Sequence, residues 1–326
     1  MNIKMKMSQF LGIFVLLFIF STISSFPVFA ANSSNLISRF EQKRIKIGAK
    51  LKEYKPPTRP NCDIRVPNQY PTIQTGVNAA ITGDTVCVDR GTYNEDVLIN
   101  KSIQLSGKGA SKSIINGQDP NASGTVYITA KNVIVEGFSI NGAGNTRGTG
   151  AVRQFEQVYD TIIRYNRIVA GNGQLAFLTD NAQNNNLVQN NILEGNNSPD
   201  IAKVNAFDNN KPTDKVNFLN NTFIGTVSPT EWQTEAFVLD AGAPNSLIKQ
   251  NVFNAAGTMV AVIASNNSSV INENNFNNGA TIKVTGGWGP PDLNAENNFW
   301  GDLDPSDNVQ GGVDYTPFAT SPFTEN

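Results

Sequence analysis

Short apolar runs recur between residues 130 and 300, and most of them lead into the same polar turn. The pattern is an asparagine, any residue, and then Phe, Ile or Leu, usually with an aliphatic residue four positions before the asparagine. It occurs at Asn166, Asn191, Asn221, Asn251, Asn274 and Asn297. An earlier copy at 133–140 has Gly137 where the asparagine is expected. Because asparagine and glycine tolerate positive φ, we expect these residues to turn the chain in the left-handed conformation.

The spacing of this pattern predicts stacked coils. The intervals between the asparagines are 25, 30, 30, 23 and 23 residues, enough for three short strands and three turns per coil. The third strand is predicted at 175–178, 204–207, 236–239, 259–263 and 281–284. A single coil cannot bury its own apolar side chains, so coils must stack, with the asparagines about 4.8 Å apart in a hydrogen-bonded column. A β-sandwich is the alternative, but it gives no reason for one turn residue to recur in register.

The two ends of the chain differ from this repeat. Residues 1–30 have the pattern of a signal peptide: Lys4 and Lys6, then an apolar run at 10–23, then small residues up to Ala30. A retained membrane anchor is the alternative. Residues 31–60 hold eight basic and two acidic residues and several prolines, which favours a solvated linker over a segment that contacts anionic polymer or lipid. We therefore expect a secreted, periplasmic or cell-surface protein that meets a membrane only through its signal peptide.

The domain of stacked coils is expected at 61–326, with an N-terminal cap at about 62–90 and a C-terminal cap at about 297–323. A capping helix is predicted after Thr72, with Ile73, Val77, Ala80 and Ile81 on one face. The only two cysteines, Cys62 and Cys87, predict one disulfide in an exported protein.

Composition removes several classes of function. The chain has no histidine, which excludes Ser-His-Asp hydrolysis, and two cysteines are too few for a structural zinc site. Residues 61–326 hold 15 basic and 25 acidic residues, which argues against nucleic acid as the partner. We expect a monomer.

Two segments resemble a known superfamily. The stretch 70–107, "YPTIQTGVNAAITGDTVCVDRGTYNEDVLINKSIQLSG", resembles the opening of right-handed parallel β-helix proteins of the pectin-lyase-like superfamily. The closing Asn-Asn-Phe-Trp-Gly at 297–301 and Val-Asp-Tyr-Thr-Pro-Phe at 313–318 are similar to the end of many bacterial members. The resemblance covers roughly 62–323 and implies an all-β, right-handed solenoid. It leaves function open, because the superfamily includes lyases, hydrolases, esterases, epimerases and non-catalytic adhesins.

The marked subfamilies match poorly. The Gly-Thr-Tyr-Asn-Glu element at 91–95 resembles pectin methylesterases, but their later Gln-Asp and Asp-Phe motifs are missing. Histidine motifs of polygalacturonases and alginate epimerases cannot occur here, and the Arg-Pro signature of pectate lyases is also absent.

One set of charged residues remains a candidate site. Asp180, Asp208 and Asp240 each follow a predicted third strand, and Arg153 lies 13 residues before Asn166, the same offset as Asp208 has before Asn221. Stacking predicts a row of the four on one side of the coils. The row could bind calcium and an acidic sugar, with Arg153 as base for β-elimination, or supply the acid and base of a glycosidase. The plainer interpretation is that each aspartate begins a turn.

A loop beside this row carries Glu231, Trp232 and Glu235, which suggests a platform for stacking on a sugar ring, although Trp232 could instead pack the loop onto its coil. The favoured hypothesis is a secreted β-helix protein that binds or acts on a polysaccharide or envelope glycan without a known catalytic signature. The alternatives are a polysaccharide lyase or glycoside hydrolase that uses the aspartate row, and a structural surface protein or adhesin. No cofactor is expected with certainty, calcium being the alternative.

Overall fold

The computed structural model describes residues 62–146, 148–155, 158–180, 185–198, 200–205, 216–227, 235–239, 246–254, 259–262, 269–277, 280–284, 292–301 and 303–324. The predicted signal peptide at 1–30 and linker at 31–60 lie outside these residues. Within the described part of the chain, no helix is both long enough and apolar enough to cross a bilayer.

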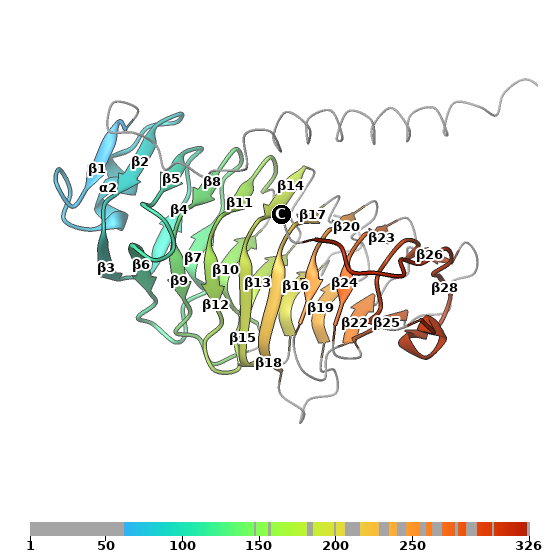
Figure 1. Cartoon of the computed structure of the whole chain (residues 1–326). Coiled ribbons are helices and arrows are strands. Elements are labelled where there is room, and N and C mark those ends of the chain that lie inside the picture. Colours follow the sequence, from blue (N-terminus) through green and yellow to red (C-terminus); the bar gives the residue numbers. More distant parts are fainter. Residues whose placement is uncertain are drawn as a thin grey trace, which may run out of the picture. The chain divides into compact units, whose positions relative to one another are not determined.

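The strands form three parallel sheets, here named A, B and C (Figure 1). Sheet A contains β1 (Ile64–Val66), β2 (Thr85–Val88), β5 (Gln104–Ser106), β8 (Ile134–Glu136), β11 (Ile162–Arg164), β14 (Asn186–Gln189), β17 (Val216–Leu219), β20 (Leu247–Lys249), β23 (Val270–Asn272), β26 (Leu293–Asn294) and β28 (Val313–Asp314). Sheet B contains β3 (Gly91–Asn94), β6 (Ser113–Asn116), β9 (Ser139–Asn141), β12 (Arg167–Val169), β15 (Ile192–Ser198), β18 (Thr222–Val227), β21 (Val252–Phe253) and β24 (Asn275–Phe276). Sheet C contains β4 (Val97–Ile99), β7 (Gly124–Ile128), β10 (Gly150–Phe155), β13 (Leu175–Asp180), β16 (Asp200–Asn205), β19 (Glu235–Leu239), β22 (Met259–Val262), β25 (Thr281–Val284) and β27 (Val309–Gln310).

From β2 to β25 the chain visits sheets A, B and C in turn, and each strand pairs in parallel with the equivalent strand one coil away. Neighbouring coils therefore share one register, so residues far apart in sequence become neighbours along a column. The expected parallel β-helix, with three strands per coil, is confirmed.

The inward side chains of all three sheets form one continuous apolar core. The inward column of sheet A consists of fully buried aliphatic and aromatic residues, such as Val135, Ile163, Val188 and Phe218. Late in sheet B the column becomes aromatic: the rings of Phe223, Phe253 and Phe276 stack with centroids 4.6 and 4.9 Å apart. Trp300 extends this stack at 4.7 Å from Phe276.

A column of buried asparagines lies at the turn between sheets A and B, as predicted, but with two corrections. The first concerns its members, which are Asn166, Asn191, Asn221, Asn251, Asn274 and Asn298. Asn298, not Asn297, therefore ends the ladder. Each link is a hydrogen bond from one side-chain amide to the amide oxygen of the next coil, for example 3.0 Å from Asn191 to Asn221.

The second correction concerns the left-handed residue. The ladder asparagines are absent from the positive-φ residues, and the residue just before each takes that conformation, such as Tyr165 (φ 56°), Gln250 (φ 58°) and Asn297 (φ 60°). Gly137 (φ 78°) occupies this position in the earlier coil, so Phe138 stands in the ladder position there. The preceding residue thus turns the chain, while the inward asparagine satisfies the buried backbone groups of that turn.

The N-terminal end of the stack is closed by helix α2 (Ile73–Ala79). Thr72 caps the helix as predicted, and Ile73 and Val77 are fully buried. The prediction that Ile81 lies on the same buried face is wrong: the helix ends before it, and Ile81 is 71% exposed. Cys62 and Cys87 form the predicted disulfide, which joins the segment before β1 to β2. At the other end, the 3₁₀ helix η2 (Pro305–Asn308) leads into β27.

Candidate functional site

The outer face of sheet C carries the predicted Arg153. Outward residues on successive strands β4, β7, β10, β13 and β16 form one column, made of Leu98, Tyr127, Arg153, Leu178 and Lys203. Two residues further along each strand, Phe155 on β10 is in register with Asp180 on β13 and with Asn205 on β16. Alternation along the strand places Arg153 and Phe155 on the same face.

Arg153 and Asp180 form an ion pair between neighbouring coils. The Nε and Nη2 atoms of Arg153 both lie 2.9 Å from Oδ2 of Asp180. Their backbones are not in direct register, because Arg153 is paired with Leu178, so the arginine side chain reaches diagonally along the face. The two predicted residues therefore do contact each other, because the arginine side chain is long enough to span the offset.

Two neighbouring aromatic rings lie beside the guanidinium of Arg153. Its Cζ atom lies 5.0 Å from the ring centroid of Phe155 and 5.8 Å from that of Tyr127. The two ring centroids are 6.4 Å apart with their planes inclined at 44°. Cations within about 6 Å of an aromatic ring are attracted by its electron-rich face. We name Tyr127, Arg153 and Phe155 the sheet C cluster.

Arg153 and Asp180 differ in how far their side chains are buried, which indicates different roles. The Asp180 side chain is fully buried, whereas that of Arg153 retains 16% of its exposure. Tyr127 and Phe155 are also half-buried. A buried carboxylate is stable only when paired, and Arg153 supplies the compensating charge. Asp180 thus orients the guanidinium, while the partly exposed arginine and rings are the groups that a ligand can contact.

The rest of the predicted row is not assembled by the described residues. The position in register with Asp180 on the next coil is Asn205, because β16 covers Asp200–Asn205 and the predicted strand at 204–207 began too late. Asp208, Asp240, Glu231 and Trp232 lie outside the described residues. Glu235 begins β19, where its backbone is in register with Asp200 and Met259.

The predicted calcium site cannot be built from what is described. Of its three carboxylates, only that of Asp180 belongs to the described part of the chain. Among those residues, no group of three or more His, Cys, Asp or Glu side chains is placed to hold a metal ion. The carboxylate of Asp180 is instead bound to an arginine.

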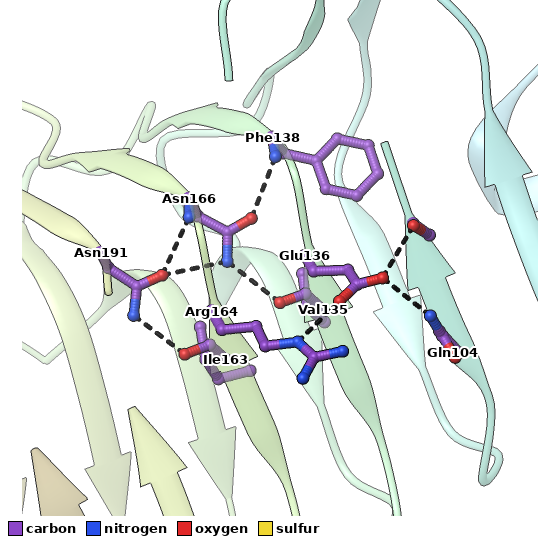
Figure 2. Close-up of polar contacts among 9 residues, drawn as sticks. Gln104, Val135, Glu136, Phe138, Ile163, Arg164, Asn166 and Asn191 are labelled. Atoms are coloured by element: carbon purple, nitrogen blue, oxygen red, sulfur yellow. Dashed lines mark hydrogen bonds and ion pairs between the residues drawn. The ribbon is translucent and has the colours of Figure 1, made fainter. Parts of the chain in front are cut away.

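A second buried carboxylate, on sheet A, forms a similar pair with an arginine (Figure 2). Glu136 accepts hydrogen bonds from Gln104 at 2.8 Å, Ser106 at 3.0 Å and Arg164 at 2.7 Å. Its side chain is only 3% exposed. The four residues come from three neighbouring coils, so this network ties coils together. Arg164 lies near one aromatic ring, that of Tyr165 at 6.0 Å, whereas Arg153 lies near two.

Sequence reasoning missed Tyr127 and Phe155. A signal was present: Phe155 follows Arg153 by two residues, the spacing that puts side chains on one face of a strand. Tyr127 could be located only from the register between β7 and β10, in which Tyr127 is the partner of Arg153. The connections between these strands vary in length from coil to coil, so the sequence alone does not give that register. The repeat marked the asparagine turns but did not fix that register.

Comparisons with known proteins found matches among solved structures alone, at low sequence identity. No protein-family model matches the chain, and no curated protein sequence matches it. Among solved structures, pectin methylesterase from carrot has a TM-score of 0.49 and 14% identity, covering 81% of this chain and 88% of that one. The ybhc protein of Escherichia coli has a TM-score of 0.48 and 17% identity, covering 71% and 75%. Rice weevil pectin methylesterase has a TM-score of 0.43 and 14% identity, covering 85% and 95%. At these identities the likeness concerns the fold alone.

Proposed function

We propose that this chain is an exported β-helix protein that binds a polysaccharide through the sheet C cluster. The observation that carries the proposal is the half-buried pair of neighbouring rings, Tyr127 and Phe155, beside an arginine. Aromatic rings offer apolar faces on which sugar rings can pack, and a guanidinium has five N–H donors for hydroxyl or carboxylate oxygens. Asp180 engages the Nε and one Nη of Arg153, so donors on the guanidinium remain for a ligand.

Preorganisation favours this face as a binding site. The arginine is held by an ion pair and by two rings, so its side chain is already ordered before a ligand arrives. Ordering a long side chain costs about 0.5–1.5 kcal/mol on binding, and a preformed site avoids that cost. Export is supported by the signal-peptide pattern at 1–30 and by the disulfide, which is typical of oxidising compartments.

Catalysis by the aspartate row is less well supported. The carboxylate of Asp180 is fully buried and paired with Arg153, so it is not exposed to a substrate. A guanidinium has only N–H donors, so it has no acceptor for a proton as the base of a β-elimination. Binding therefore requires fewer assumptions than turnover.

The test is a glycan array with the secreted chain, followed by titration of the best ligand against variants. We expect Tyr127→Ala and Phe155→Ala each to weaken binding up to about tenfold, since one aromatic contact is worth about 0.5–1.5 kcal/mol. Tyr159→Ala is a matched control, because Tyr159 is also half-buried and lies 5.2 Å from a lysine Nζ, but outside sheet C.

Each outcome decides between the hypotheses. If all three variants bind the glycan with the same affinity, the sheet C cluster is not the binding site. Absence of any glycan ligand would favour a structural protein or adhesin. Release of reducing sugar or of unsaturated product from a uronate polymer would restore the enzyme hypotheses.

A further inference from the structure

A groove lies at the turn between sheets A and B in the later coils, and its volume is about 200 Å³. It is lined by the outward turn residues Asn220, Gln250 and Glu273, by Val252 from β21, and by Phe323 near the C-terminus. The turn residues come from three successive coils and share the left-handed conformation, with φ of 56°, 58° and 54°. The groove therefore runs along the stack, across the coils.

The C-terminal segment forms one wall of this groove. In Figure 1 the last described residues return from β28 along the outside of the stack toward β20 and β17. The side-chain amide of Asn275 donates to the carbonyl oxygen of Phe323 at 2.8 Å and accepts from its N–H at 2.8 Å. Asn275 is only 6% exposed, so this two-point contact fixes the backbone that carries the Phe323 ring.

The opposite wall is polar but electrically balanced. Gln250 donates to Glu273 at 2.9 Å, and the ammonium of Lys249 lies 2.7 Å from the other oxygen of that carboxylate. Amide groups both donate and accept, as sugar hydroxyls do. With the Glu273 charge compensated by Lys249, the groove does not select for an ionic ligand.

From this geometry we propose that the groove is a second glycan site, which takes a neutral stretch of a linear polysaccharide lying along the stack. Phe323 provides the ring face and Val252 the apolar floor, while Asn220 and Gln250 hydrogen-bond the hydroxyls. The repeat of one polar side chain per coil, about 4.8 Å apart, suits a ligand with regularly spaced hydroxyls.

A peptide is a poorer fit for the groove. The strands beneath it, β18, β21 and β24, are hydrogen-bonded to one another in parallel, so no strand edge is open for a peptide to extend. A peptide would also need apolar pockets for alternate side chains, and Val252 is the one aliphatic residue among those that line the groove.

The experiment titrates the full secreted chain with neutral arabinan, galactan and xylan oligosaccharides. We expect Phe323→Ala to weaken binding of the best neutral ligand up to about tenfold, from the loss of one aromatic contact. Gln250→Ala should weaken it about fivefold, from the loss of one hydrogen-bonding side chain. Leu303→Ala is the control, because Leu303 is 72% exposed in the same terminal region and outside the groove.

The site is independent of the sheet C cluster, and the variants separate the two. If no neutral oligosaccharide binds, or if Phe323→Ala and Gln250→Ala bind as tightly as the parent chain, the second site is refuted. If neutral ligands are lost only in Tyr127→Ala, the second site is also refuted while the sheet C proposal stands. Unchanged melting temperatures in both groove variants would confirm that lost affinity does not come from unfolding.

Discussion

Two columns of hydrogen-bonded asparagine side chains, among the described residues, differ in their physical setting. Asn94, Asn116 and Asn141 form a surface column at the ends of β3, β6 and β9, with links of 3.0 and 2.7 Å. The later column, from Asn166 to Asn298, has links of similar length but is buried at 0–2% exposure. Water can replace the first set of hydrogen bonds and cannot reach the second.

The partners of the buried column explain why it is repeated. The Asn191 oxygen accepts from both the backbone N–H and the side-chain amide of Asn166, while its own amide donates to Ile163 and to Asn221 (Figure 2 shows the first three contacts). Every hydrogen-bonding group of the side chain is used. The early coils, which lack this interior column, have the helix cap, the disulfide and the Glu136 network instead.

The largest effect is expected from Asn191→Ala. The substitution leaves two donors of Asn166 and the carbonyl of Ile163 buried without a partner, and each such group costs about 1–3 kcal/mol. We expect the free energy of unfolding to fall by about 3 kcal/mol or more. Denaturant unfolding followed by circular dichroism measures it.

The matched control is Asn116→Ala in the surface column. Here solvent replaces the lost contacts, and the expected change stays within about 0.5 kcal/mol, as at most surface positions. Equal losses in the two variants would contradict the distinction between the columns.

A smaller effect is expected from Phe253→Leu, at the centre of the aromatic stack. The ring of Phe253 stacks on Phe223 and Phe276 with interplanar angles of 14° and 5°. Leucine keeps most of the apolar burial and removes two ring contacts worth about 0.5–1.5 kcal/mol each, so a loss of about 1–3 kcal/mol is expected. An equal loss for Ile140→Leu, in the aliphatic part of the same column, would show that the stack adds nothing specific.

The smallest effect is a pH dependence in the early coils. Burial, followed by the charges of Asp89 and Glu95, raises the pKa of Tyr93 to about 12. The ordinary value is about 10, so the unfolded chain loses this proton first. The stability that Tyr93 contributes is present below about pH 10 and is lost as the pH rises toward 12. Melting temperatures at pH 9 to 12 should fall less steeply in Tyr93→Phe than in the parent chain.

The sequence predicted the repeat more reliably than the contacts between repeats. The asparagine pattern identified the β-helix because one turn residue recurs wherever coils stack. It misplaced the left-handed residue by one position, since both asparagine and glycine suit that conformation and several turns contain adjacent asparagines, such as Asn190 and Asn191. Positive φ at Tyr165 and Glu273 could not be expected from residue type.

The candidate site depended on the part of the repeat that varies. Arg153 and Asp180 were recognised together because they occupy similar offsets from their asparagines. The same offset from the ladder asparagine predicted Asp208 next to Asp180, but the residue in register with Asp180 on β16 is Asn205. The connection that follows β16 is longer than those after β10 and β13. Loop length sets the register of sheet C, and local sequence patterns do not encode it.

The central claim is that Tyr127, Arg153 and Phe155 form the polysaccharide-binding face. The most direct measurement is a crystal structure of the chain with the oligosaccharide that binds best on the glycan array. The account predicts a sugar ring packed against Tyr127 or Phe155, with one of its oxygens hydrogen-bonded to the Arg153 guanidinium. A sugar bound on another face, with the sheet C cluster left bare, would contradict it.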